Sequence, residues 1–498
     1  MVHQCIFVLI FTYFALIANI RGLDSEISDS TQASYDNLDA DLTPIQIIKK
    51  YGYPSEAHAV KSKDGYILEL HRIPYGKAGP GDKKRIPIFL HHGLLSSSID
   101  WIINGPNKSL GYRLADEGYD VWMANARGNT FSRQHVKYSP KQKEFWNYSF
   151  HEMAFYDLPA AIDHILETTE EKQLIYIGFS MGTTVFYAMA STLPEYQKKI
   201  KFQISLAPVS AIPHTNSAAR LLISYVDQIN KAADWYSNGA FLEHDLIAKT
   251  LGPFFCGASN TSNNDNFCKK YIFFGIFGKN PEQFDDNLLP VISNNFPAGT
   301  SCKNMIHFSQ LISSGTFAQF NYERAENMKR YGSYIPPKYK INKIRVPMRF
   351  YYSDNDLLST PLDTKLLYQN IAKPLGLKRV NLDKFSHIDF LWAKDINRLL
   401  NDEIIEFINN STNHNSKGSS NFIQNTITEA LDTRKNTPVP VNVPFDEKSF
   451  LVNVGKDFLG NVYDNIDNAV GNAISDSIKK IQAGGEKIRT YFEDLLKG

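Results

Sequence analysis

Short apolar segments alternate with amphipathic ones through the middle of the chain. Residues 57–72, AHAVKSKDGYILELHR, alternate polar and apolar positions around Asp64-Gly65, which predicts a β-hairpin. Beyond it, runs that are apolar on both faces stand between helix-like stretches such as residues 151–169, a pattern typical of a parallel sheet covered by helices on both sides. The expected buried strands are IPIFLHH from Ile86, YDVWMA from Tyr119, LIYIGFS from Leu174, FQISLA from Phe202 and MRFYYS from Met348. We therefore predict an α/β protein with a mostly parallel central sheet.

The alternation stops between Pro208 and about Pro347, where Phe- and Asn-rich sequence such as YIFFGIFG intervenes. The strand pattern resumes afterwards. We therefore expect a mainly helical cap inserted between two strands of one sheet, in preference to a second independent domain.

Both ends of the chain differ from the middle. An apolar run from Cys5 to about Ala18 is too short to span a bilayer and predicts a signal peptide at residues 1–22, with an uncleaved anchor as the alternative. Residues 409–448, with NNSTNHNSKGSSN and NTPVPVNVP, predict a linker. In residues 449–498 apolar side chains recur about every four positions, which predicts an amphipathic helical extension that binds a lipid surface or a partner, or packs on the catalytic domain.

Charge and cysteine content narrow the class of protein. Fifty-three basic residues against 52 acidic ones leave a formal charge of +1, which gives no electrostatic footprint for nucleic acid. Cys256 and Cys268 flank a polar stretch that a disulfide would close, whereas no second Cys or His stands nearby at metal-ligand spacing. Glycosylation acceptor sequons, which fit an exported protein, occur at Asn107, Asn147, Asn260, Asn409 and Asn410.

Residues 178–182, GFSMG, match the pattern G-x-S-x-G. The pattern alone is weak, but QLIYI before it is strand-like and TTVFYAMAS after it is helix-like. A sharp strand-to-helix turn lifts the serine hydroxyl clear of the sheet, and glycines on both sides avoid steric conflict. We therefore expect Ser180 to be a nucleophile and Gly178 and Gly182 to form its elbow, with a glycine-rich turn of an ordinary α/β protein as the alternative.

A serine nucleophile needs a base, and the base needs an anion to orient it. Asp356 follows the strand MRFYYS, and His387 stands 31 positions later, between an expected strand at residues 379–382 and a helical stretch. The order Ser, acid, His is that of the hydrolase fold. The competing acids are Asp354, Asp363 and Asp389, of which the last is too close to His387 along the chain to be preferred.

The negative charge that develops on an attacked carbonyl requires N–H donors. One is expected from Met181, directly after the nucleophile, and the other from Leu94 in the loop HHGLL after the strand IPIFL. His92 in the same loop could be mistaken for a catalytic base, but a histidine before the oxyanion glycine is more often a structural hydrogen-bonding residue.

These residues together resemble the animal acid lipases, the group that contains gastric lipase, lysosomal acid lipase and many insect digestive lipases. The resemblance runs over about residues 42–408, with the blocks KKYGYPSEAHAVKSKDGYILELHRIPYG, HHGLLSSSIDWI, GYDVWMANARGN, GFSMGTT, PAGTSCKNMIHFSQ, DNDLLSTPLD and SHIDFLWAKD. It implies a lipase domain at 23–408 with a lidded cap at about 209–333 inserted in it. It also implies the triad Ser180, Asp356 and His387, the oxyanion donors Leu94 and Met181, and a disulfide between Cys256 and Cys268.

The resemblance has three departures and one clear functional implication. Many members have GHSQG and an Asn before the catalytic His, where this chain has GFSMG and Ser386, and the tail beyond residue 409 has no counterpart. We expect a secreted glycoprotein, with lysosomal or gut-lumen placement equally compatible, that hydrolyses triacylglycerol or steryl esters through an acyl-enzyme, without a metal or organic cofactor. Its expected partners are the neutral lipid ester and a lipid–water interface bound peripherally. The alternatives are a non-catalytic lipid carrier on a lipase scaffold and an esterase for smaller esters.

Overall fold

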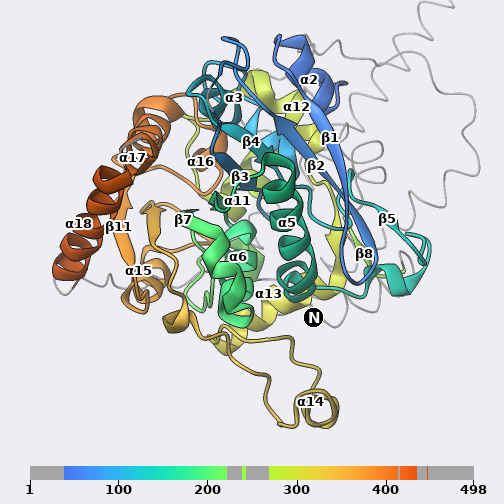
Figure 1. Ribbon diagram of the computed structural model, residues 1–498. Coiled ribbons are helices and arrows are strands. Elements are labelled where there is room, and N and C mark those ends of the chain that lie inside the picture. The colour runs from blue at the N-terminus through green and yellow to red at the C-terminus, as the bar shows by residue number, and fades with distance from the viewer. Residues whose placement is uncertain are drawn as a thin grey trace, which may run out of the picture. The chain divides into compact units, whose positions relative to one another are not determined.

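A nine-stranded mixed sheet runs through the computed structural model of the protein (Figure 1), which describes residues 39–82, 84–220, 238–242, 268–412, 416–434 and 446. The strand order is β1-β2-β4-β3-β6-β7-β10-β11, with β5 paired to β2. Strands β4, β3, β6, β7, β10 and β11 are parallel, and β1 and β2 add the predicted antiparallel hairpin at one edge. The strands are β1 (Glu56–Lys61), β2 (Tyr66–Ile73), β3 (Pro87–His91), β4 (Asp120–Met123), β5 (Gln134–His135), β6 (Leu174–Phe179), β7 (Ile200–Leu206), β10 (Met348–Tyr352) and β11 (Pro374–Arg379), beside a small separate pair, β8 (Ala240–Phe241) and β9 (Thr300–Ser301).

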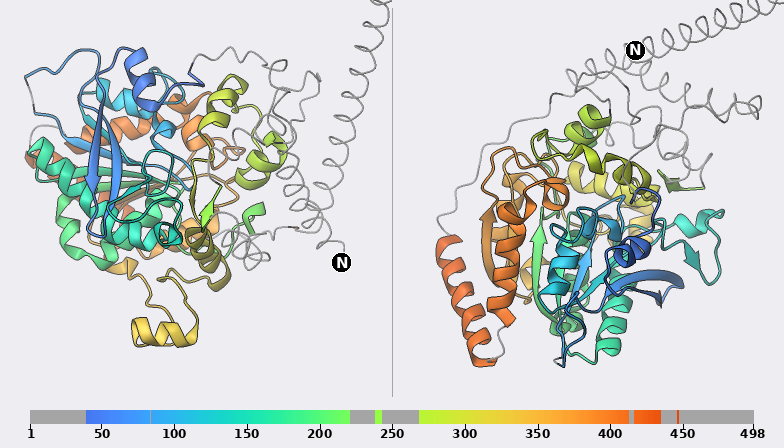
Figure 2. Two further views of the ribbon diagram at one scale, coloured as in Figure 1. Left: turned by 90° about the vertical axis from the view of Figure 1, so that its right-hand side faces the viewer. Right: turned by 90° about the horizontal axis from the view of Figure 1, so that it is seen from above.

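Helices cover both faces of the sheet (Figures 1 and 2). The α-helices outside the insertion are α2 (Pro44–Lys50), α3 (Leu110–Asp116), α4 (Phe150–Glu152), α5 (Leu158–Thr169), α6 (Met181–Thr192), α15 (Pro361–Gln369), α16 (Asp389–Trp392), α17 (Asp402–Thr412) and α18 (Ser416–Arg434). In β3, Ile88 and Leu90 join the hydrophobic core that contains α3, α16 and α17, whereas Phe89 joins the core that contains α5 and α6. Successive side chains of a strand point to opposite faces, so a strand buried on both sides is mostly apolar, with paired polar exceptions such as Asp120 in β4.

The long insertion leaves the sheet continuous. Strand β7 ends at Leu206 and β10 begins at Met348, yet the two are parallel neighbours, with Met348 opposite Gln203. The described part of the insertion contains the β8–β9 pair and the helices α11 (Phe274–Phe277), α12 (Leu289–Asn295), α13 (Cys302–Ser314) and α14 (Arg324–Tyr331). The fold class expected from the sequence, an α/β protein with a mostly parallel central sheet, is confirmed, and the described part of the insertion is mainly helical.

Two expectations need correction. The strand expected at residues 379–382 is instead β11, Pro374–Arg379, which pairs with β10 from Met348 opposite Pro374 onward. Its Pro and Gly residues mimic a loop, but Pro374 stands at the first position of an edge strand, where the missing N–H costs no ladder hydrogen bond.

The second correction concerns the expected linker at residues 409–448. Helix α17 continues to Thr412, and α18 occupies Ser416–Arg434. Five of its residues, Phe422, Ile423, Ile427, Ala430 and Leu431, form an apolar stripe at helical spacing that is buried or packed against the body. The ring of Phe422 lies 6.0 Å from that of Phe407 in α17. The stripe is diluted by Asn, Ser and Thr, which explains why composition alone indicated a linker.

Several expectations fall outside the described residues. These are the signal peptide at residues 1–22, the disulfide partner Cys256, the sequon at Asn260 and the extension at residues 449–498. Within the described ranges, no helix combines the length and apolarity that a bilayer crossing requires.

Candidate active site

Ser180 occupies a sharp turn between β6 and α6. Its backbone has φ 50° and ψ −115°, a left-handed conformation that a residue with a side chain adopts only under strain, on the order of 1–3 kcal/mol. The turn is held by the Ser180 N–H, which donates to Leu206 O of the neighbouring strand β7 (3.0 Å), and by Thr183 N–H, which donates to Ser180 O (2.9 Å). The strand-turn-helix context expected around this serine is present.

The two glycines of the turn are required by close backbone approach. A Cβ atom on Gly182 would lie 2.3 Å from His91 O at the end of β3, and one on Gly178 would lie 2.8 Å from Gly182 C. Real Cβ atoms do not come this close to backbone, so any larger residue would push α6 away from β3 and β6.

His387 and Asp356 form a buried pair. His387 Nδ1 lies 2.7 Å from Asp356 Oδ2, and their side chains are 2% and 0% exposed. The other carboxylate oxygen of Asp356 accepts hydrogen bonds from Leu358 N–H (2.9 Å) and Ser359 N–H (2.7 Å). Because Nδ1 donates to the carboxylate, Nε2 of the neutral ring is left as an acceptor.

The alternative acids all face other groups. Asp354 Oδ2 accepts from Arg379 Nε (2.6 Å), Asp363 Oδ1 pairs with His214 Nδ1 (2.6 Å), and Asp389 Oδ2 accepts from Ser386 N–H (2.6 Å) and Asn280 Nδ2 (2.7 Å). Burial raises the pKa of Asp389 to about 6. Asp389 thus anchors the residue before His387 and does not contact its ring.

The residue before the serine, Phe179, packs against His387. The Phe179 ring lies 4.9 Å from the His387 ring, and Phe277 of α11 stacks on the histidine at 5.9 Å with planes 7° apart. No hydrogen bond joins Ser180 Oγ to His387 in the part of the chain that the structure describes. Catalytic hydrogen bonds are often long without substrate and tighten when it binds.

The expected oxyanion donors flank the serine. Met181 is the first residue of α6, so its N–H has no acceptor within the helix. Leu94 lies in a turn closed by Ser96 N–H and Gly93 O (3.4 Å), with Leu95 at φ 64°. A Cβ atom on Gly93 would lie 3.4 Å from Ser180 Cβ, so this turn passes directly beside the nucleophile.

His92 supports the same turn. Its Nε2 accepts from Ala126 N–H (3.0 Å), so its Nδ1 carries the proton and donates to Gly93 O (2.7 Å). Burial lowers the pKa of His92 to about 3, which keeps the ring neutral. The structure agrees with a hydrogen-bonding role for His92.

Asp100 is a buried acid behind the same turn that sequence reasoning missed. It is 3% exposed in a short helical turn, Ser98–Trp101, and neither carboxyl oxygen has a hydrogen-bond partner within ordinary range among the described residues. Burial raises its pKa to about 7, although the Ser96 hydroxyl, the Trp392 indole and the Gly93 backbone lie near enough to oppose the rise. In the sequence, the sign of this residue was a charged position between the apolar residues Ile99 and Trp101, within the block HHGLLSSSIDWI.

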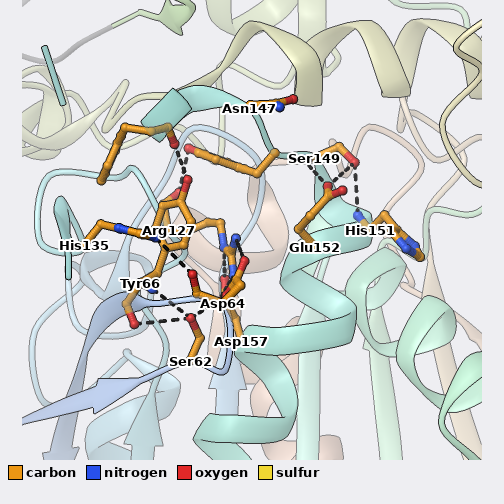
Figure 3. A network of polar contacts seen from close by, with 12 residues as sticks. Ser62, Asp64, Tyr66, Arg127, His135, Asn147, Ser149, His151, Glu152 and Asp157 are labelled. Carbon is orange, nitrogen blue, oxygen red and sulfur yellow. Dashed lines mark hydrogen bonds and ion pairs between the residues drawn. The ribbon is translucent and has the colours of Figure 1, made fainter. Parts of the chain in front are cut away.

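A second buried polar network centres on Arg127 (Figure 3). The Arg127 guanidinium, fully buried after β4, contacts Asp64 of the hairpin turn (2.7 and 2.9 Å) and Asp157 before α5 (2.5 and 2.7 Å). It also lies 3.9 Å from the centre of the Tyr66 ring. Burial raises the pKa of Asp157 to about 6 even beside this cation. The network joins the edge hairpin to the helix layer and does not reach the serine.

Four of the five sequons can be placed. Asn107, Asn147 and Asn410 are exposed, whereas Asn409 is half-buried and its side chain is held by Tyr119 Oη (2.7 Å) and Glu117 Oε2 (3.0 Å). As for metals, the described ranges hold no group of three or more His, Cys, Asp or Glu side chains arranged as ligands.

Comparison with known proteins adds independent findings. Residues 44–105 match the family model of a partial α/β-hydrolase lipase region, and residues 86–236 match that of the α/β-hydrolase fold. The chain is 37% identical to Lipase 1 of Drosophila melanogaster (76% of this chain, 82% of that protein) and 38% identical to gastric triacylglycerol lipase of Bos taurus (75% and 92%). It is 38% identical to a putative lysosomal acid lipase/cholesteryl ester hydrolase of Crotalus adamanteus (70% and 86%). Among solved structures, an acetylester hydrolase from Corynebacterium glutamicum aligns at a TM-score of 0.45 and 14% identity, over 74% of this chain and 98% of that one.

Proposed function

Since the chain belongs to the animal acid lipase family, we propose that it hydrolyses triacylglycerol or steryl esters with Ser180 as the nucleophile. Lipase activity, that is carboxylic ester hydrolysis, follows from the family. The assignment of the serine, its acid and its base rests on the geometry of this chain.

The observation that carries the proposal is the buried hydrogen bond between His387 Nδ1 and Asp356 Oδ2, beside a serine in a strained strand-to-helix turn. A carboxylate on Nδ1 fixes the ring so that Nε2 can take the proton of Ser180 Oγ, and it stabilises the imidazolium that results. The two backbone N–H donors that hold Asp356 keep its carboxylate oriented toward the ring.

The reaction then has two halves. Ser180 Oγ attacks the ester carbonyl while His387 Nε2 accepts its proton, and the N–H groups of Leu94 and Met181 stabilise the oxyanion. His387 returns the proton to the leaving alcohol, which leaves an acyl-enzyme. Water, deprotonated by the same Nε2, attacks the acyl carbon, and the fatty acid departs as Ser180 regains its proton.

Apolar walls around His387 favour a fatty acyl substrate. Phe277, which stacks on His387, lies 6.3 Å from Phe296, and Phe296 lies 6.1 Å from Trp392. Such a wall excludes water from the histidine and matches an acyl chain in polarity. The named relatives, a triacylglycerol lipase and a putative cholesteryl ester hydrolase, suggest the two headgroup classes to test.

We further propose that the enzyme is exported and carries three features of an exported protein. They are removal of residues 1–22, a disulfide between Cys256 and Cys268, and glycans at the acceptor sequons, for which Asn107, Asn147 and Asn410 are exposed. The helical extension at residues 449–498 is proposed to bind lipid surfaces.

The test combines active-site labelling with a substrate panel. A fluorophosphonate probe should label the wild type and leave Ser180→Ala unlabelled, and hydrolysis of triacylglycerols, steryl esters and short-chain esters should fall to background in the same variant. Turnover by Ser180→Ala equal to wild type would reject the nucleophile. Lipid binding without labelling or turnover by the wild type would instead indicate a carrier.

A further inference from the structure

A loop projects from the body after α13. Gln319 N–H donates to Pro337 O (2.9 Å) and Tyr339 N–H to Phe317 O (2.9 Å), which closes a two-stranded stem, and α14 lies at the far end (Figure 1). We call residues 317–340 the basic arm.

The basic arm is internally ordered. Asn327 is 1% exposed at its centre, where Nδ2 donates to Asn321 Oδ1 (2.6 Å) and to Tyr334 O (3.1 Å), while Oδ1 accepts from Tyr322 N–H (2.9 Å). These bonds join both sides of the loop through one side chain. The arm therefore presents its outer surface in a fixed arrangement before any partner binds.

That outer surface is unusually apolar. Met328, Tyr334 and Ile335 are 38%, 55% and 69% exposed, and they account for three of the seven large hydrophobic side chains exposed in the described part of the chain. Three such side chains within eight positions of an ordered loop mark an interaction site, since scattered single exposures are the usual case.

The charge of the basic arm differs from that of the whole chain. Five basic residues, Arg324, Lys329, Arg330, Lys338 and Lys340, stand against Glu323 and Glu326, although the complete chain is nearly neutral. Glu326 is already shared by Arg330 (2.7 Å) and Lys329 (3.8 Å), and the Arg324 guanidinium lies 5.0 Å from the centre of the Tyr334 ring. Cationic residues thus stand on both sides of the exposed apolar positions along the arm, and one of them, Arg324, lies against the Tyr334 ring.

We propose that the basic arm docks the enzyme on an anionic lipid–water interface. Apolar side chains that enter the acyl boundary, ringed by Lys and Arg that face anionic headgroups, are the combination that such a surface binds. The choice of a lipid surface over an acidic protein rests on the proposed lipase function.

Helix α13 connects the basic arm to the site. Helix α13 begins beside the nucleophile turn, where Asn304 Nδ2 contacts Met181 Sδ (3.5 Å), and its 13 residues end shortly before the stem. At 1.5 Å per residue the helix spans about 20 Å. Docking through the arm therefore holds the enzyme on the interface without occupying the site.

Binding is measured by flotation of full-length Ser180→Ala protein with phosphatidylcholine vesicles, with and without phosphatidylglycerol. In this background Ile335→Asp should lower partition to the anionic vesicles about tenfold. Lys329→Glu with Lys338→Glu should weaken it similarly and flatten its salt dependence. The matched control is Val136→Asp, because Val136 is 63% exposed outside the arm, and it should bind as the parent does.

The same substitutions in the active enzyme should leave hydrolysis of a soluble short-chain ester unchanged, which also shows that they fold. Unchanged vesicle partition for Ile335→Asp overturns the proposal, and so does equal binding to neutral and anionic vesicles. Loss of self-association in Ile335→Asp, without a vesicle effect, would assign the arm to a protein contact instead. If the wild type binds vesicles through the arm but hydrolyses no ester, the lipase proposal fails while the docking result stands.

Discussion

Asp100 makes the stability of the folded domain depend on pH in a predictable direction. Burial raises its pKa from 3.8 to about 7, so between these values the folded protein holds a proton that the unfolded chain has released. The contribution of the Asp100 carboxyl to the free energy of unfolding is therefore fully present below about pH 3.8 and is lost as the pH rises through about 7. We predict that Asp100→Asn, which cannot ionise, is close to neutral at pH 4 and stabilising at pH 8.

The size of the effect follows from the two pKa values. Their difference of about 3 corresponds to at most about 4 kcal/mol, at about 1.36 kcal/mol for each tenfold step. A folded unit of about 400 residues has an unfolding entropy near 0.8 kcal/mol/K, at about 2.1 cal/mol/K per residue. The difference in melting temperature between Asp100→Asn and wild type should therefore rise by up to about 5 °C from pH 4 to pH 8.

Differential scanning calorimetry or fluorimetry of both proteins across this pH range provides the test. Other groups contribute to each curve: burial lowers the pKa of His91 to about 4 and of His92 and His307 to about 3, so these histidines destabilise the fold as the pH falls below about 6.5. The difference between variant and wild type removes their contribution. Asp82→Asn, at an exposed acid, is the control. A difference curve for Asp100→Asn that stays flat from pH 4 to pH 8 would refute the reasoning.

Three further predictions concern the proposed triad, the Arg127 network and the residues beyond Asn409. Asp356→Asn should lower kcat on a soluble ester about 10⁴-fold with little change in KM, while Asp354→Asn should stay near wild type, and similar kcat values for the two would count against Asp356 as the orienting acid. Arg127→Met leaves Asp157 buried without its cation and should cost about 3–5 kcal/mol in urea unfolding, so a loss below about 1 kcal/mol would contradict the ion-pair argument. Truncation after Arg434 should preserve soluble-ester activity and melting temperature but weaken droplet binding, whereas truncation after Asn409 should also lower the melting temperature, since it removes the packed residues Ile427 and Ala430.

Local pattern predicted most of the sheet because buried strands carry their own signature. Every position of β3, β4 and β6 is buried, and each strand appeared in the sequence as a predominantly apolar run. Strand β11 was misplaced because it is an edge strand whose Pro374 and Gly376 resemble a turn. Helix α18 was missed because only its inner stripe is apolar, and that stripe has meaning only against the surface of α17 and β11.

The parts of the site that depend on a fixed residue spacing could be predicted from the sequence. The parts that depend on how distant segments pack could not. The turn at Ser180 needs glycines at fixed spacing, so the motif is visible in one dimension. Residue type does not distinguish the three aspartates Asp354, Asp356 and Asp363. Only the folded loop puts Asp356 against His387. The displaced pKa of Asp100 arises from burial behind the Gly93 turn, which no local pattern encodes.

The pairing of β7 with β10 also sets the order in which the protein becomes complete during synthesis. About 200 residues separate Ser180 from His387, and most of them belong to the insertion. At about 5–20 residues per second the ribosome needs roughly 10–40 s to cross that distance. During this interval the nascent chain carries the proposed nucleophile without its base, and β7 shows an unpaired edge that invites aggregation. A translation product that ends inside the insertion is therefore both inactive and prone to aggregate.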